Sequence, residues 1–286
     1  MLNMAETPII FDRALLRARR ARALALGPAT FLIDRVADEM AERLGAVLRR
    51  FEHAADLGTP NDALRRALTS KVGGMVAIAS DDEALPLRES SLDLVVSGLA
   101  LQFANDLPGV LVQVRRALRP DGLFLAALVG GESLSELREA FAAAEAEIEG
   151  GVSPRVAPFA DLRDLGALLQ RAGFALPVTD VDRLTVRYAT PLALMHDLRR
   201  MGATNALVER RRQPLRRATL RRMLEVYAER FAGPDGRIPA TFEIVWLSGW
   251  APDPSQQQPL KPGSAKTRLA DALGATEIST GEKVER

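Results

Sequence analysis

The first part of the chain carries apolar residues at helical spacing. The stripe predicts a helix over residues 29–50, and its members are Ile33, Val36, Met40, Leu44 and Val47 or Leu48. A second helical pattern covers residues 12–26, and the glycine and proline at 27–28 separate the two. We therefore expect residues 1–50 to form an N-terminal helical segment that precedes a sheet.

Short apolar runs then alternate with helical patterns. We expect strands at 54–57, 75–79, 92–97 and 123–129, and we expect helices at 62–68 and 108–118. Such alternation indicates parallel strands joined by crossover helices.

The second half of the chain continues the α/β pattern. Ser133 and Glu136 have the spacing of a capping box, which predicts a helix that runs to Ile148. A helix over 161–171 is expected to end at Gly173, because glycine suits a left-handed cap. We also expect helices at 190–201 and 219–231, a strand near 183–188 and a closing strand at 241–248.

These elements suggest a division of the chain into three parts. Residues 51–251 are expected to form one α/β domain, with a helical insertion at about 190–232. The Pro, Gln, Ser and Lys content from Pro252 onward predicts a mobile tail over 252–286.

Composition excludes several kinds of chemistry. The 286 residues include no cysteine, so there is no disulfide framework, thiolate metal site or cysteine nucleophile. No apolar run approaches the roughly 20 residues needed to cross a bilayer. No Gly-x-Ser-x-Gly elbow is present, which argues against a hydrolase. The two histidines, His53 and His196, are far apart in sequence, and we expect core or surface roles for them and no metal site.

Arginine is unevenly distributed. The cluster at residues 13–22 has the composition of a transit peptide, but it runs into a helical pattern without a clear cleavage signal. A structural helix is therefore favoured. We expect the bacterial cytoplasm as the location, or the mitochondrial matrix if the chain is eukaryotic.

A second cluster, the arginine segment, holds nine arginines within residues 199–222 and only one acid among them, Glu209. Some of these guanidinium groups are expected to face either solvent or an acidic partner, such as an acidic protein or an anionic membrane surface. A solvated helix face is an equally good interpretation. Nucleic acid fits less well, because no aromatic residues interleave to stack on bases.

Several motifs resemble a known family. Residues 80–86, 92–97 and 118–122 are similar to the class I methyltransferase superfamily, which uses S-adenosylmethionine. The more specific runs are Gly-Gly-Glu-Ser-Leu-Ser-Glu-Leu-Arg at 130–138, Glu-Gly-Gly-Val-Ser-Pro at 149–154, and residues 164–174. Together they resemble the respiratory complex I assembly factor of methyltransferase fold, over roughly residues 11–250. The bacterial malonyl-acyl-carrier-protein methyltransferase is a more distant relative that is similar at residues 198–205.

The resemblance implies a Rossmann-like α/β sheet and a cofactor site. Asp56 and Gly58 would lie in the first loop that contacts S-adenosylmethionine, and Asp81 with Asp82 would face the adenine. Ser97 completes the cofactor-binding residues that the resemblance implies. A solvated turn before Pro86 is an equally good interpretation of Asp81 and Asp82.

Three departures from the family pattern argue against binding of S-adenosylmethionine. The first loop keeps only Gly58, followed by the branched Thr59 and by Pro60, which lacks a backbone donor. Only 30 positions separate Asp56 from Pro86, so a βα unit and its ribose-binding acid are expected to be missing. Residues 102–103, Gln-Phe, stand where the family usually has a His-Trp type pair beside the substrate pocket.

These losses predict weak or absent binding of S-adenosylmethionine. Each polar group of the ligand that is left unpaired costs about 1–3 kcal/mol of binding free energy. Because about 1.4 kcal/mol corresponds to a tenfold change in affinity, the affinity for S-adenosylmethionine is expected to fall by roughly two to four orders of magnitude.

The sequence is compatible with three hypotheses about the function. The leading one is a complex I assembly factor, a pseudoenzyme candidate with a degraded cofactor cleft, which binds a complex I subunit. The sequence leaves open whether it also modifies that subunit. Relatives of this kind are associated with hydroxylation of a subunit arginine, a reaction that needs an oxidant, and no catalytic residue for it is evident here. The alternative is an active methyltransferase on a protein side chain or a carboxylate, as in the malonyl-carrier-protein type. In the third, the cleft is a packed structural remnant.

Overall fold

The computed structural model describes residues 8–78, 84–257, 270–271 and 274–276. The chain divides into two compact units, Met1–Pro252 and Asp253–Arg286. The tail expected from Pro252 lies largely outside the described residues. Within the described ranges, no helix is both long and apolar enough to cross a membrane.

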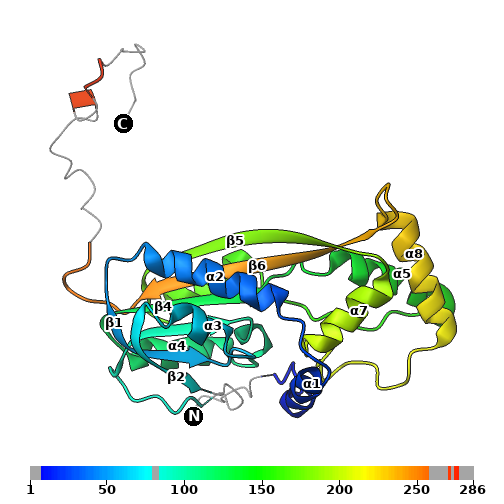
Figure 1. Cartoon of the computed structure of the whole chain (residues 1–286), viewed down its shortest axis with the longest axis horizontal. Helices are drawn as coiled ribbons and strands as arrows, with labels where there is room; N and C mark the ends of the chain where they lie inside the picture. The colour runs from blue at the N-terminus through cyan, green and yellow to red at the C-terminus, as the bar shows by residue number, and fades with distance from the viewer. Residues whose placement is uncertain (1–7, 79–83, 258–269, 272–273, 277–286) are drawn as a thin grey trace, which may run out of the picture. The chain divides into compact units, whose positions relative to one another are not determined.

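The first unit is built on a six-stranded sheet with the order β2-β1-β3-β4-β6-β5 (Figure 1). The strands are β1 (Phe51–Leu57), β2 (Val72–Ile78), β3 (Leu92–Gly98), β4 (Leu118–Val129), β5 (Ala175–Tyr188) and β6 (Ile238–Trp250). Strands β1 to β4 are parallel, which confirms the expected crossover pattern. Strand β6 is antiparallel to both β4 and β5.

Strands β5 and β6 are longer than the sequence pattern predicts. They pair with each other from Ala175–Trp250 to Tyr188–Ile238, whereas the pairing of β4 with β6 stops at Val129. Figure 1 shows the two strands running side by side toward the helices α5, α7 and α8. The extension beyond β4 is therefore formed by residues 183–188 of β5 and 238–243 of β6. Residues 175–182 pair with the part of β6 that β4 also contacts, and this backbone pairing explains why they are strand although none of their side chains is buried.

Helices cover both faces of the sheet. Their bounds are α1 (Arg13–Ala25), α2 (Phe31–Gly45), α3 (Ala63–Leu68), α4 (Leu107–Ala117), α5 (Ser135–Glu149), α6 (Leu162–Arg171), α7 (Pro191–Arg200) and α8 (Arg217–Phe231). Alternate residues of β3 enter two different cores, as period-2 geometry requires. Leu94 and Val96 pack with α2, α3, α5, α7 and α8, whereas Val95 packs with α4 and α6.

The second predicted helix is shorter than expected. Helix α2 ends at Gly45 and not at Arg50. Val47 still packs against the core, but Leu48 is fully exposed. The apolar stripe ends once the chain has turned toward β1, so the periodic pattern overstated the helix by one turn.

The capping box predicted at Ser133 and Glu136 is wrong, because both side chains bind β6. The residue before helix α5 is Leu134, which has a φ of 56° and makes no side-chain cap. The Ser133 hydroxyl donates to the carbonyl of Glu243 (3.1 Å) and accepts from its N–H (2.9 Å). The Glu136 carboxylate accepts from the N–H (3.1 Å) and the hydroxyl (2.6 Å) of Thr241. These side chains satisfy backbone groups of β6 that β4 no longer reaches.

Strand β2 lies at the edge of the sheet, and none of its residues is buried. Parallel strands are normally covered on both faces. Between β2 and β3, the described residues 84–91 add neither a helix nor a strand. The narrow sheet agrees with the expected loss of one βα unit.

We predict that Glu136→Ala destabilises the protein by about 1–3 kcal/mol, because it leaves the partly buried N–H of Thr241 in β6 without its acceptor. Urea unfolding followed by circular dichroism measures the change. Glu139→Ala is the matched control, since Glu139 is an exposed residue of the same helix and should change stability by at most about 0.5 kcal/mol. Equal effects of the two substitutions would contradict the role assigned to Glu136.

Candidate functional site

The topology places a candidate site at the carboxyl ends of β1 and β3. Strand β1 connects through α3 to β2 on one side, and the chain then crosses to β3 on the other side. In open α/β sheets, ligands bind where the strand order reverses in this way. The residues that follow β1 and β3 are therefore the first to consider.

Asp56 is buried at this point and is held by Thr59. The Thr59 hydroxyl donates to the Asp56 carboxylate and accepts from the N–H of Gly98 at 3.0 Å. Burial raises the pKa of Asp56, although the hydrogen bond from Thr59 and the charge of Arg65 act in the opposite direction. One hydroxyl thus links the ends of the two strands that flank the switch point.

The other predicted cofactor residues have varied surroundings. Gly58 adopts a φ of 72° and donates its N–H to the carbonyl of Ile78 at 2.8 Å. Ser97 is fully buried and donates to the carbonyl of Leu57 at 2.7 Å. Asp81 and Asp82 lie outside the described residues. The structure thus brings Asp56, Gly58 and Ser97 together, with their polar groups engaged by the protein itself.

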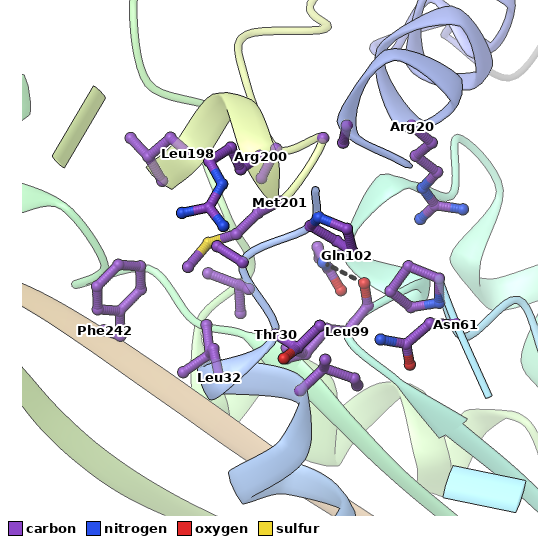
Figure 2. Close-up of a pocket in the computed structure, with 18 of the residues that line it drawn as sticks. Arg20, Thr30, Leu32, Asn61, Leu99, Gln102, Leu198, Arg200, Met201 and Phe242 are labelled. Carbon is purple, nitrogen blue, oxygen red and sulfur yellow. Dashed lines mark hydrogen bonds between the residues drawn. The ribbon is translucent and has the colours of Figure 1, made fainter. Parts of the chain in front are cut away.

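A pocket of about 100 Å³ opens beside this loop (Figure 2). Its floor includes Pro60 and Asn61 after β1, and Leu99 after β3. Neither Asp56 nor Ser97 lines it. The remaining wall is mainly apolar and includes Leu32, Ile33, Leu134, Phe159, Leu198, Met201 and Phe242. This volume is below the roughly 300–1,000 Å³ of pockets that hold drug-sized ligands, so the pocket suits a small group.

Helix α1 and the end of α7 form the roof of the pocket. Gly202, just after α7, has a φ of 70°, and a Cβ there would lie 3.0 Å from the Cα of Arg20. The roof is also fixed by a bond from the N–H of Asp12 to the carbonyl of Ala206 (2.8 Å) and by the ion pair of Asp12 with Arg210. A glycine is needed at 202 because the two backbones approach so closely.

Gln102 and Phe103, which replace the His-Trp type pair, do line this pocket. The Gln102 amide donates to the carbonyl of Leu99 at 2.8 Å, as Figure 2 shows. Its Oε1 atom is buried and has no partner among the described atoms. Phe103 packs edge to face against Phe11, with 5.5 Å between ring centroids. Gln102 therefore places an amide at the pocket, and an amide does not take a proton at neutral pH.

Two arginines line the pocket. Arg20 comes from α1, with its guanidinium 5.9 Å from the Phe103 ring centroid. Arg200 ends α7, donates from Nε to the carbonyl of Gly27 at 2.7 Å, and lies 3.4 Å from Asp197. Figure 2 shows both side chains among the lining residues. They make the roof side of the pocket cationic.

Sequence reasoning missed most of this pocket. Thr30 and Phe242 line it but come from segments with no motif of their own. Three signals were present. Pro60 of the first loop and the pair Gln102-Phe103 line the pocket, and so do Leu198, Arg200 and Met201 from the run that resembles the malonyl-carrier-protein methyltransferase.

The two histidines lie apart from the pocket. His53 is on β1, 3.3 Å from Asp93, and His196 is exposed on α7. In the ranges that the structure covers, no three His, Asp or Glu side chains are grouped so that they could hold a metal ion.

The charge balance of the arginine segment differs from the expectation. Glu209 is not its only acid, because carboxylates from α1, α5, α7 and α8 pair with the segment. Six of the nine arginines form ion pairs, namely Arg200, Arg210, Arg211, Arg216, Arg221 and Arg222. Counting acids along the sequence missed partners that the fold brings in, such as Asp12 and Glu149.

Comparison with known proteins agrees with the fold. A methyltransferase-domain family matches residues 39–126. The YcgJ protein of Bacillus subtilis has a TM-score of 0.50 at 14% identity, covering 77% of this chain and 99% of that one. A putative methyltransferase of Bacillus halodurans has the same TM-score at 15% identity, covering 75% and 98%.

Two kinds of relative are similar in sequence. The proteins named "Arginine-hydroxylase NDUFAF5, mitochondrial" of zebrafish and human are each 36% identical, covering 92% of this chain and 89% and 83% of their own lengths. A malonyl-[acyl-carrier protein] O-methyltransferase of Laribacter hongkongensis is 37% identical, covering 87% of this chain and 82% of its own.

The sheet, the matched domain and the relatives place the chain in the class I S-adenosylmethionine-dependent methyltransferase superfamily. Within that superfamily, the chain belongs to the family of the mitochondrial arginine-hydroxylase NDUFAF5.

We predict that Asp56→Asn changes how stability depends on pH. Because burial raises the pKa of Asp56 in the folded state, the folded protein holds this proton more tightly than the unfolded chain does. The stability of the native protein relative to Asp56→Asn should therefore fall as pH rises from about 4, the ordinary carboxyl pKa, through the raised value. Urea unfolding at a series of pH values measures this difference, and a difference that is constant or grows with pH would contradict the prediction.

Proposed function

We propose that the chain is a methyltransferase-fold assembly factor for respiratory complex I, which acts by binding a subunit of that complex. The likeness to arginine-hydroxylases over 92% of the chain carries this proposal. In this proposal the protein works in the bacterial cytoplasm, or in the mitochondrial matrix if the chain is eukaryotic.

The proposal includes weak or absent binding of S-adenosylmethionine. The methyltransferase family implies that cofactor, but three features of the first loop argue against tight binding. Pro60 offers no N–H, the N–H of Gly58 is bonded to Ile78, and the N–H of Gly98 is bonded to Thr59. A cofactor would have to break these bonds or do without the donors that glycine-rich loops supply.

Calorimetry with S-adenosylhomocysteine tests the cofactor part. We expect no low-micromolar binding by the native chain, and we expect Pro60→Gly to bind about fivefold more tightly, because one restored hydrogen bond contributes about 1 kcal/mol. Pro108→Gly is the control, since Pro108 lies in the first turn of α4 and outside this loop. Low-micromolar affinity in the native chain would overturn the degraded cleft, while the role in assembly would stand.

The arginine segment supports an acidic partner. Arg212 and Arg217 are exposed and make no ion pair with a described carboxylate, and Arg221 keeps 85% of its side chain exposed despite its pair with Glu225. Arg217 opens helix α8, where positive charge is unfavourable because of the helix dipole. An acidic protein surface would offset that repulsion, and the headgroups of an anionic membrane are the other expected contact.

Co-purification with complex I subunits tests the assembly role. We expect the triple substitution Arg212→Glu, Arg217→Glu and Arg221→Glu to reduce subunit recovery at least tenfold, because it reverses three exposed charges. Arg88, Arg116 and Arg171 are exposed arginines outside the segment, and their reversal to Glu is the control with the same change in charge. Equal recovery for both triple variants would contradict the docking surface, and absence of any subunit with the native chain would contradict the assembly role.

A second candidate is an active methyltransferase that acts on a carboxylate or a protein side chain. The 37% identity to a malonyl-[acyl-carrier protein] O-methyltransferase over 87% of this chain favours it. Incubation with S-adenosylmethionine and the malonyl carrier protein, followed by mass spectrometry, distinguishes the candidates. Addition of one methyl group would support the second candidate, and an unchanged mass would support the first.

A further inference from the structure

The segment of residues 10–12, which we call the strap, lies between two loops that border the pocket. One loop, residues 102–105, comes after β3 and contributes Gln102 and Phe103 to the pocket lining. The other loop, residues 203–210, comes after α7 and contributes Ala203 to the roof. The strap therefore connects the β3 side of the pocket with its roof.

On the β3 side, the strap is held by one side chain. The Oδ1 atom of Asn105 accepts from the N–H groups of Ile10 (2.8 Å) and Phe11 (2.7 Å), and the Asn105 amide donates to the carbonyl of Phe11 (3.2 Å). Backbone groups that are withdrawn from water need partners of this kind. Asn105 thus orders three backbone groups of the strap at once.

On the roof side, the strap is held by a backbone bridge and an ion pair. Phe11 and Leu207 face each other in an isolated antiparallel bridge, whose two N–H···O bonds measure 2.8 and 2.9 Å. Arg210 reinforces the bridge, because its guanidinium lies 3.3 Å from the Asp12 carboxylate and donates to the carbonyl of Leu207 at 2.7 Å. Helix α1 begins at Arg13, directly after the strap. Both parts of the roof, α1 and the loop after α7, thus meet at the strap.

The strap has only a small apolar anchor. Phe11 and Leu207 belong to a cluster of six buried residues, which is separate from the two larger clusters on the faces of the sheet. Segments with few buried apolar contacts open at a lower free energy than the whole domain unfolds. The strap can therefore detach while both faces of the sheet stay packed.

We propose that the strap is a closure that controls access to the pocket. The attached strap holds the pocket at about 100 Å³, which is below the roughly 300–1,000 Å³ of pockets that hold drug-sized ligands. Detachment frees α1 and the loop after α7 to move away from Gln102 and Phe103, and the pocket then admits a larger ligand. This inference goes beyond the proposed function and does not depend on it.

A single thiol in the pocket tests the closure. The sequence contains no cysteine, so Val129→Cys introduces the only thiol, at the end of β4 and in the pocket lining. The probe is dithiobis(nitrobenzoate), an aromatic disulfide that is larger than the closed pocket, and the absorbance of the released thiolate gives the reaction rate. Because this rate follows the population of the open form, we expect the folded Val129→Cys protein to react at least about tenfold more slowly than the same chain unfolded in urea.

Two substitutions, each added to Val129→Cys, release the strap from one side at a time. Asn105→Ala removes the partner of three backbone groups and should speed the reaction about tenfold, and Arg210→Met removes the contacts with Asp12 and Leu207 and should speed it about fivefold. Circular dichroism shows whether each variant is folded. If Asn105→Ala does not fold, Arg210→Met decides the question alone.

Gln113→Ala and Arg212→Met are the matched controls. Gln113 accepts from the N–H of Leu85 at 2.8 Å, but it lies on α4 and does not line the pocket. Arg212 is exposed and makes no ion pair with a described carboxylate. We expect both controls to react at the rate of Val129→Cys alone. The proposal is overturned if folded Val129→Cys reacts as fast as the unfolded chain, if the strap variants leave the rate unchanged, or if the controls speed the reaction equally.

Discussion

The hydroxyl of Thr59 joins the two strands on which the site depends. It donates to the buried carboxylate of Asp56 and accepts from the N–H of Gly98, so the ends of β1 and β3 share one side chain. A buried carboxylate needs such a donor to offset its lost hydration. The contact also occupies the N–H of Gly98, a backbone donor at the switch point that would otherwise be available to a nucleotide. The hydrogen bonds that stabilise this loop therefore lower its affinity for a cofactor.

Beyond the loop, the long strand β6 organises the molecule. Its first half pairs with β5 alone, and its remaining backbone groups are bound by side chains at the start of α5. Helix α2 is joined to β5 by ion pairs of Arg35 with Asp182 and of Arg43 with Asp180, each at 2.8 Å. Of the two roof helices, α7 packs against the antiparallel strand β5 and α1 packs against α7, whereas the floor of the pocket comes from loops that follow the parallel strands β1 and β3.

The sequence predicts the local elements well and the long-range contacts poorly. Strand β3 and helix α6 follow from apolar periodicity, and Gly173 has the expected positive φ of 83°. Ser133 and Glu136 have the spacing of a cap, yet they bind a strand more than 100 positions away, and no local pattern encodes that choice. Residues 175–182 are strand because β6 lies beside them. Likewise Arg20 reaches the pocket because Gly202 admits a close approach, which is visible only in three dimensions.

The uncovered edge of the sheet has a consequence for the behaviour of the protein in a crowded cell. On its outer side β2 has no partner strand among the residues that the structure describes, and an unpaired strand edge is a template for joining a second molecule. Strand β2 carries Gly73 and Gly74 in its first half and follows Lys71. Glycine is a weak strand former, and a charged lysine hinders stacking of one molecule on another. The glycines of β2 and the neighbouring lysine thus disfavour self-association of the protein through this edge of the sheet.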